Sequence, residues 1–296
     1  MSTEEGAAKI ILGGRFGEEP SQLSWQRLDR FVEAGGRAVD TAHSYADGRS
    51  EQVIGEWMRA NPGKLVVVDK IGYPDDIGAV DLSPHRLRGE VAESCRRLSV
   101  STLDVVLLHR DSPVVSVDEA ADALTELVDQ GDAWEIGVSN WTADRLDRLV
   151  VALAARGHIP VASYQRSLAV PLTQLWPGAR HADASVLQVA ARHRLVMLAW
   201  AAQARGFFTG TTEPPSPGQP DPFDSPTNRA RRRRCRELAS DISSRPETVA
   251  FAWLLHQSDT RPIIGPRSIA ELNASLEAAH LSLDPVTLRW LAEDAR

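Results

Sequence analysis

The chain has 296 residues, of which 43% are hydrophobic and 25% charged, and its formal net charge is −7 at pH 7. This is the composition of a globular protein with a sizeable core, and the acidic balance argues against nonspecific binding to nucleic acid. With two cysteines, a polar N-terminal segment and no apolar run near the roughly 20 residues of a bilayer span, we expect a cytoplasmic protein without a disulfide framework or membrane contact.

Eight short, nearly continuous apolar runs alternate with longer segments of helical periodicity. Runs this short and this rich in Val, Ile and Leu are typical of strands that are buried on both faces of a parallel sheet. Most are separated by about the ~30 residues of one βαβ unit, and no composition break divides the chain. We therefore predict an α/β fold with one domain over residues 1–296, a closed (β/α)8 TIM barrel. The predicted strands are residues 10–12, 37–40, 65–70, 103–109, 134–139, 161–165, 196–200 and 262–265.

The segments between the strands are amphipathic. Leu146, Leu149 and Leu153, for example, share one helical face. Several of these segments end at a glycine that is placed to take the left-handed conformation of a helix C-cap. These glycines are Gly35, Gly131 and Gly157.

Two segments depart from this repeat, and the second is the C-terminal LSLDPVTLRWLAEDAR (281–296), which predicts one last helix. Residues 205–228 are rich in Pro, Gly, Asp and Ser and follow the seventh strand, which predicts a long loop. We expect it to act as a lid with Phe207, Phe208 and Phe223 as anchors. The basic run at residues 231–234 lies on a predicted helix and is interpreted as a solvated face, with a phosphate-binding patch as the alternative.

Polar side chains stand at the C-terminal ends of the predicted strands, where active sites of such barrels lie. Taken singly, Asp40 could cap a turn and His109 could be a core histidine. Lys70 is harder to explain, because an ammonium at the end of an apolar strand must be paired. The residues found in this way are Asp40, Tyr45 in the following loop, Lys70, His109, Ser139, Asn140 and Gln165.

The first four of these residues suit the reduction of a carbonyl. The developing alkoxide needs a proton donor, and tyrosine, with a free pKa of about 10, is a poor one at neutral pH. We expect Tyr45 to be the acid and the ammonium of Lys70 to lower its pKa. Asp40 then anchors Lys70, and His109 orients the substrate oxygen.

With these residues at these positions, the chain resembles the aldo-keto reductase superfamily over nearly its whole length. The resemblance implies a (β/α)8 barrel that reduces an aldehyde, ketone or sugar-like carbonyl with NADPH, with NADH possible but less favoured. It also places the catalytic roles on Asp40, Tyr45, Lys70 and His109. The similar segments are AVDTAHSYADGRSE (38–51), DK (69–70), LLHR (107–110), GVSN (137–140), LAWAAQARGFFTG (198–210) and IIGPRS (263–268).

The same resemblance implies a set of cofactor-binding residues. Trp200 would stack on the nicotinamide, and Arg267 with Ser268 would bind the adenosine 2′-phosphate, which a guanidinium and a hydroxyl suit well. Phe16 would form a wall of the substrate pocket. The carboxamide would be held by Ser139, Asn140 and Gln165, and the pyrophosphate would be approached by Ala201, Arg205 and Gly206.

The chain also departs from the family pattern. Ala201 and Ala202 replace the usual Ser-Pro, and Ala274 and Ser275 replace a frequent Glu-Asn. Glu271 stands where Gln or Arg is common, and an acid there would repel a 2′-phosphate. These changes weaken the expectation of tight NADPH binding and leave the catalytic residues untouched.

Two other functions remain open from the sequence. One is a cofactor-binding regulatory subunit on the same barrel, and the other is a non-redox barrel enzyme that uses Lys70 as a Schiff-base amine. The sequence has no G-x-G-x-x-G motif after a strand, no P-loop and no paired histidines at metal-ligand spacing. We therefore expect a small-molecule carbonyl as the partner and no metal.

Overall fold

A closed parallel barrel forms the centre of the molecule. The computed structural model describes residues 3–14, 16–74, 80–210 and 220–294. Its eight strands pair in chain order, and β8 pairs back with β1 to close the barrel, which confirms the predicted fold and all eight strands. The strands are β1 (Ile11–Leu12), β2 (Ala38–Asp40), β3 (Val66–Ile71), β4 (Leu103–Leu108), β5 (Ala133–Ser139), β6 (Val161–Gln165), β7 (Met197–Trp200) and β8 (Thr260–Ile264).

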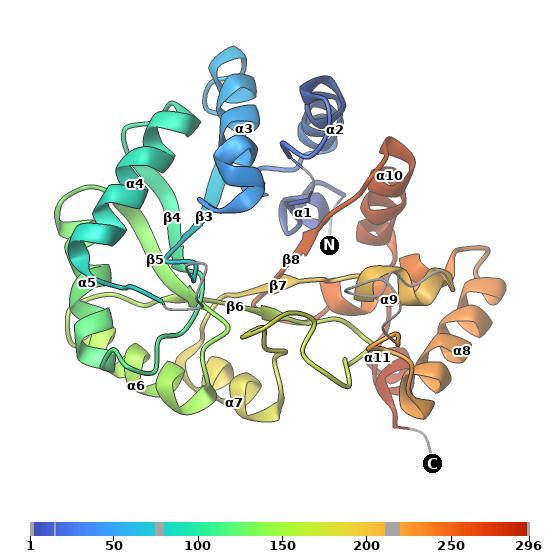
Figure 1. Cartoon of the computed structure of the whole chain (residues 1–296). Helices are drawn as coiled ribbons and strands as arrows, with labels where there is room; N and C mark the ends of the chain where they lie inside the picture. Colours follow the sequence, from blue (N-terminus) through green and yellow to red (C-terminus); the bar gives the residue numbers. More distant parts are fainter. Residues whose placement is uncertain (1–2, 15, 75–79, 211–219, 295–296) are drawn as a thin grey trace.

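Helices surround the barrel (Figure 1). Two of them, α8 and α9, follow β7, and α8 lies on the outside, where it contacts α11. Within the part of the chain that the structure describes, no helix is both long and apolar enough to cross a membrane. The α-helices are α1 (Thr3–Ala8), α2 (Ser21–Glu33), α3 (Arg49–Ala60), α4 (Pro84–Leu98), α5 (Val117–Asp129), α6 (Ala143–Ala154), α7 (Ala184–His193), α8 (Pro226–Asp241), α9 (Pro246–Leu255), α10 (Ile269–Glu277) and α11 (Pro285–Ala292), and the 3-10 helices are η1 (Tyr45–Gly48), η2 (Ala204–Thr209) and η3 (Ala278–His280).

The apolar core has two parts. The larger part lies between the strands and the helices, and a smaller layer fills the barrel. Since side chains alternate between the two faces of a strand, the residue two positions after an interior one also points into the barrel. The interior layer consists of Ile11, Val68, Val105, Leu107, Val161, Leu198 and Ile263.

The helix ends follow local sequence signals. Gly35, Gly131 and Gly157 have φ values of 95°, 76° and 87°, so all three take the left-handed conformation predicted for them. Helix α5 begins with a capping box in which Ser116 accepts from the Glu119 amide and the Glu119 carboxylate accepts from the Ser116 amide.

The segment 205–228 is only partly the loop that was expected. Its first residues belong to η2, and α8 begins at Pro226. Residues 211–219 lie outside the described residues, and the predicted lid falls largely on them. The three phenylalanines are buried and pack together, with 5.4 Å between the ring centroids of Phe207 and Phe208 and 6.3 Å between those of Phe207 and Phe223. They therefore hold the two ends of this segment close to each other.

The interpretation of residues 231–234 as a solvated face is wrong for most of the run. Arg231 donates to the carbonyls of Leu168 and Ala292, and Arg234 donates to the carbonyl of Glu293. Unpaired carbonyls at the end of α11 attract these guanidinium groups. Phe16 is likewise not a pocket wall, because its side chain is buried in the core between strands and helices.

Candidate active site

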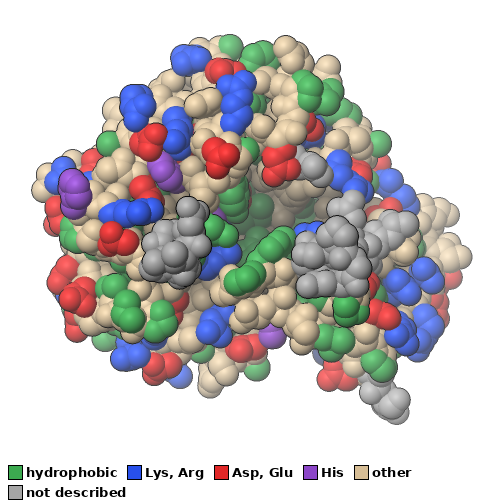
Figure 2. Space-filling model, in the orientation of Figure 1, with side chains coloured by type: hydrophobic (Ala, Val, Ile, Leu, Met, Phe, Trp, Pro, Cys, Tyr) green, Lys and Arg blue, Asp and Glu red, His purple; other side chains and the backbone are tan. Residues whose placement is uncertain are grey.

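The candidate catalytic side chains gather at one end of the barrel because of strand periodicity. Val68 and Leu107 belong to the interior layer, so Lys70 and His109, two residues later, also point inward. The same alternation places Asp40 two residues after Ala38, which packs against that layer. The face seen in Figure 2 is hollowed at its centre, with hydrophobic (green) and Lys or Arg (blue) side chains beside the hollow. The apolar layer thus forms a floor, and the polar groups lie one level above it.

Asp40, Lys70 and Tyr45 form one connected group. The Lys70 Nζ lies 2.6 Å from Asp40 Oδ1, donates to the Thr41 carbonyl at 2.8 Å, and sits 4.9 Å from the centroid of the Tyr45 ring. Lys70 and Asp40 are both buried. The ammonium is therefore paired, as its position at the end of an apolar strand requires.

The local charges decide the protonation states of this group. Burial alone favours neutral Lys70, yet Asp40 and Tyr45 together raise the pKa of Lys70 above its ordinary value, so it carries its proton at neutral pH. The pKa of Tyr45 is also raised, because burial outweighs the opposing effect of Lys70. The expectation of a lowered Tyr45 pKa is therefore wrong for the net shift. A phenol that keeps its proton is the state that a proton donor needs.

His109 is poised as a neutral hydrogen-bonding group. Its ring lies edge-on to Tyr45, with 5.6 Å between centroids, and its Nδ1 is buried with no partner among the described residues. Burial, then the charges of Lys70 and Arg110, hold the pKa of His109 well below its ordinary value. The ring therefore stays uncharged and can orient a substrate oxygen without competing for its proton.

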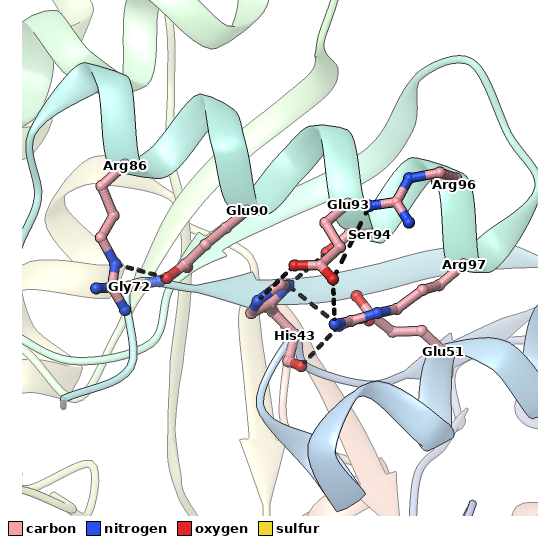
Figure 3. Close-up of polar contacts among 9 residues, drawn as sticks. All are labelled: His43, Glu51, Gly72, Arg86, Glu90, Glu93, Ser94, Arg96 and Arg97. Carbon is pink, nitrogen blue, oxygen red and sulfur yellow. Dashed lines mark hydrogen bonds and ion pairs between the residues drawn. The ribbon is translucent and has the colours of Figure 1, made fainter. Parts of the chain in front are cut away.

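The loop that carries Tyr45 is held from behind by a network that the sequence did not reveal (Figure 3). Arg97 donates to the His43 carbonyl at 3.2 Å and to Glu51 at 2.8 Å. Gly48 has a φ of 81°, and a Cβ there would lie 2.3 Å from the Arg97 guanidinium. The left-handed backbone favours glycine here, and a side chain at this position would displace the Arg97 guanidinium that holds the Tyr45 turn.

A second carboxyl group lies behind Lys70. Asp69 points out of the barrel, is fully buried, and accepts from the Lys70 amide through Oδ1 at 2.8 Å. Its Oδ2 and Glu51 Oε1 are buried without a donor among the described groups, and the two side chains are within hydrogen-bonding reach. Burial and Glu51 raise the pKa of Asp69 well above the usual carboxyl range. One proton held between the two groups satisfies both oxygens.

The residues expected at the nicotinamide lie at the ends of the next two strands, β5 and β6, and β5 pairs with β4 just before His109. Asn140 donates to Ser139 Oγ at 2.7 Å and accepts from the Arg180 amide at 2.9 Å, so it positions its neighbours. Ser139 keeps a hydroxyl proton to donate, and Gln165, whose Nε2 donates to Ser167 Oγ at 3.0 Å, keeps a carbonyl oxygen to accept. A carboxamide offers the complementary pair, so a nicotinamide fits these residues.

The expected stacking residue, Trp200, ends β7, and the expected pyrophosphate residues follow it. The Trp200 ring lies 5.6 Å from that of Trp176, and the Arg205 guanidinium lies 5.1 Å from the Trp176 centroid. Ala201, Arg205 and Gly206 all have positive φ values. Such left-handed turns present successive amide groups to one side, which suits a pyrophosphate.

The expected 2′-phosphate residues already have partners. Arg267 forms an ion pair with Glu271 at 3.2 Å, and its amide also donates to the Glu271 carboxylate at 2.8 Å. Ser268 caps α10 by accepting from the Glu271 amide at 3.2 Å. A phosphate bound there would compete with Glu271 for Arg267. The described side chains include no group of three or more His, Cys, Asp or Glu that could hold a metal ion.

Comparisons with known proteins agree with this geometry. A family model described as "Aldo/keto reductase family" matches residues 9–292. The chain is 26% identical to norsolorinic acid reductase A of Aspergillus parasiticus, over 93% of this chain and 72% of that protein. It is also 26% identical to an aryl-alcohol dehydrogenase [NADP(+)] of Phanerodontia chrysosporium, over 93% and 77%. A crystal structure of an aldo/keto reductase from Klebsiella pneumoniae in complex with NADP and acetate has the same fold, with a TM-score of 0.74, 22% identity, and coverage of 95% and 89%.

Proposed function

The chain belongs to the aldo/keto reductase family, and from this premise we propose that it reduces a small-molecule carbonyl compound to an alcohol with NADPH. The observation that carries the proposal is the group of Asp40, Tyr45, Lys70 and His109 at one end of the barrel. A protonated phenol lies there in contact with a fixed ammonium and with a neutral imidazole. Together they supply the acid and the electrostatic field that a forming alkoxide needs.

The chemistry of the reaction follows from these states. NADPH, when bound, supplies a hydride to the carbonyl carbon. The carbonyl oxygen takes the proton of the Tyr45 hydroxyl, and the phenolate regains a proton from solvent. Lys70 stabilises the phenolate while it exists, and Asp40 keeps Lys70 charged. His109 donates one hydrogen bond to the substrate oxygen and so fixes the carbonyl.

The preference for NADPH over NADH rests on two supports. Arg267 and Ser268 stand at the N-terminus of α10, where a helix favours an anion. The names of one relative and of the similar crystal structure also mention NADP. Glu271 opposes this preference through its ion pair with Arg267.

The substrate is proposed to be an aldehyde or ketone with an aromatic group. Two relatives are named for their action on norsolorinic acid and on aryl alcohols. In this chain Tyr73 is 43% exposed beside His109, and Trp176 is 40% exposed beside Trp200. Partly open aromatic rings beside His109 and beside the expected nicotinamide residue Trp200 favour a planar apolar ligand.

The two alternative functions fit the site less well. A Schiff-base lysine must be neutral to attack a carbonyl, whereas the pKa of Lys70 is raised. A regulatory subunit without turnover does not need the Tyr45–Lys70–Asp40 group.

The test is a turnover assay with benzaldehyde and a panel of aliphatic, aromatic and sugar aldehydes, each with NADPH and with NADH. We expect consumption of NADPH in step with alcohol formation. NADPH binding without turnover of any carbonyl would favour the regulatory function. Trapping of a substrate on Lys70 by borohydride would favour the Schiff-base enzyme.

A further inference from the structure

Arg110, which directly follows His109, is a half-buried cation that has no acidic partner among the described residues. Its one hydrogen bond within the described part of the chain is from Nη1 to the His109 carbonyl, at 2.9 Å. The neighbouring carboxylate, Asp111, is taken by Arg145 at 2.9 Å, and Arg145 also donates to two backbone carbonyls. The acidic residue that follows Arg110 in sequence is therefore paired with Arg145 and not with Arg110.

The Arg110 guanidinium is held over the candidate active site. It lies 5.4 Å from the centroid of Tyr73, and the Tyr73 ring lies 4.8 Å from that of His109. On the other side, a Cβ at Gly178 would lie 3.3 Å from Arg110 Cδ, so this loop packs closely on the arginine stem. The loops after β3 and β6 thus fix the cation beside the group that binds the carbonyl.

Burying the Arg110 guanidinium is unfavourable unless an anion binds beside it. Burial lowers the pKa of Arg110, and the opposing effects of Tyr73 and Tyr45 are too small to reverse it. A cation–π contact with Tyr73 offsets part of the cost. Four of the five N–H donors of this guanidinium nevertheless have no acceptor within the described ranges of the chain. A planar fork of this kind matches the shape and the single charge of a carboxylate.

We propose that Arg110 binds a carboxylate of the substrate, so that the preferred substrates are aromatic aldehydes or ketones that also carry a carboxylate group. The Tyr73 ring supports the aromatic part of the substrate, and His109 receives its carbonyl oxygen. This inference rests on the proposed reductase function and specifies its substrate class.

The first test compares 3- and 4-carboxybenzaldehyde with the uncharged isosteres 3- and 4-formylbenzamide. In the wild-type protein we expect kcat/KM for at least one acid to exceed that for its amide by about tenfold to a hundredfold, the usual effect of a charge-assisted hydrogen bond. In Arg110→Met this ratio should fall to about one, and in Arg110→Lys it should lie between. The control is Arg180→Met, an exposed arginine on the loop that packs on Arg110, which should keep the wild-type ratio.

A ratio near one in the wild-type protein, or an unchanged ratio in Arg110→Met, would overturn the proposal. Because the ratio is taken within one protein, a general loss of activity in a variant does not affect it. The wild-type ratio remains decisive even where a variant does not fold.

The second test measures binding without turnover. Benzoate should quench the tryptophan fluorescence of the wild-type protein with at least about tenfold tighter binding than benzamide, and Arg110→Met should remove this difference. If benzoate bound in this way but no carbonyl were reduced, the reductase function would fail and the carboxylate site would stand. If acid and amide were reduced equally well and benzoate did not bind, the reverse would hold.

Discussion

At the level of single residues, Lys70 is the charged group that contacts or influences each of the other candidate catalytic residues. Its ammonium contacts Asp40, the Thr41 carbonyl and the Tyr45 ring, and it also lowers the pKa of His109. Burying such a cation would be unfavourable without Asp40. Lys70 and Tyr45 should therefore act as one unit in the reaction.

This coupling can be measured with a double-mutant cycle. We expect Tyr45→Phe and Lys70→Met each to lower kcat by about 10²- to 10⁴-fold, and the double variant to be little worse than either. Lys70→Met leaves Asp40 buried and unpaired, so Lys70→Met with Asp40→Asn should regain stability but not activity. Losses that multiply in the Tyr45–Lys70 cycle would show that Lys70 acts independently.

Asp69 leads to a prediction about stability and pH. Its pKa is raised in the folded protein, so above pH ~4 the unfolded chain releases this proton while the folded protein retains it. The folded state then binds more protons, and stability falls as pH rises from there through the folded pKa. Asp69→Asn keeps the acceptor for the Lys70 amide and offers Glu51 a permanent donor.

We therefore expect Asp69→Asn to stabilise the protein at pH 8 by about 1 kcal/mol, the usual size of a hydrogen bond, and the gain to shrink toward pH 5. Thermal unfolding over this pH range measures the difference in stability between the variant and the wild type. Asp129→Asn, at an exposed position of α5, is the control. A variant less stable than wild type at every pH would mean that Asp69 is ionised.

At the level of elements, the N-terminus of α10 combines a phosphate site with a competing acid. Ser268 caps the helix, and Glu271 on its first turn is bonded to both the amide and the guanidinium of Arg267. Arg267 and Glu271 are each about half exposed, and such pairs contribute only about 0–1 kcal/mol. A bound 2′-phosphate should therefore displace the Glu271 carboxylate.

Cofactor kinetics test this competition. Arg267→Ala should raise the KM for NADPH at least about tenfold and leave the KM for NADH almost unchanged. Glu271→Gln should lower the KM for NADPH about twofold to fivefold, since the amide can still accept from the Arg267 amide while the repulsion is gone. Equal weakening of both cofactors by Arg267→Ala would indicate that Arg267 shapes the loop instead.

At the level of the whole molecule, the regular part of the fold could be predicted from sequence, because most barrel strands are buried on both faces and most helices carry an apolar stripe. The same alternation predicts that Lys70 and His109 project from the barrel interior, above Val68 and Leu107. The structure also brings together contacts that are distant in sequence. Asp69 meets Glu51 across β3 and α3, and Arg231 meets Ala292 across α8 and α11. No local pattern encodes such pairs.

The central claim is that Tyr45 gives its proton to a carbonyl that receives hydride from NADPH. The most direct measurement is kcat of Tyr45→Phe with benzaldehyde, beside its Kd for NADPH from tryptophan fluorescence. We expect a fall in kcat of about 10²-fold or more with an unchanged Kd, because the ring remains and only the acid is lost. Wild-type kcat in a variant that binds NADPH normally would contradict it.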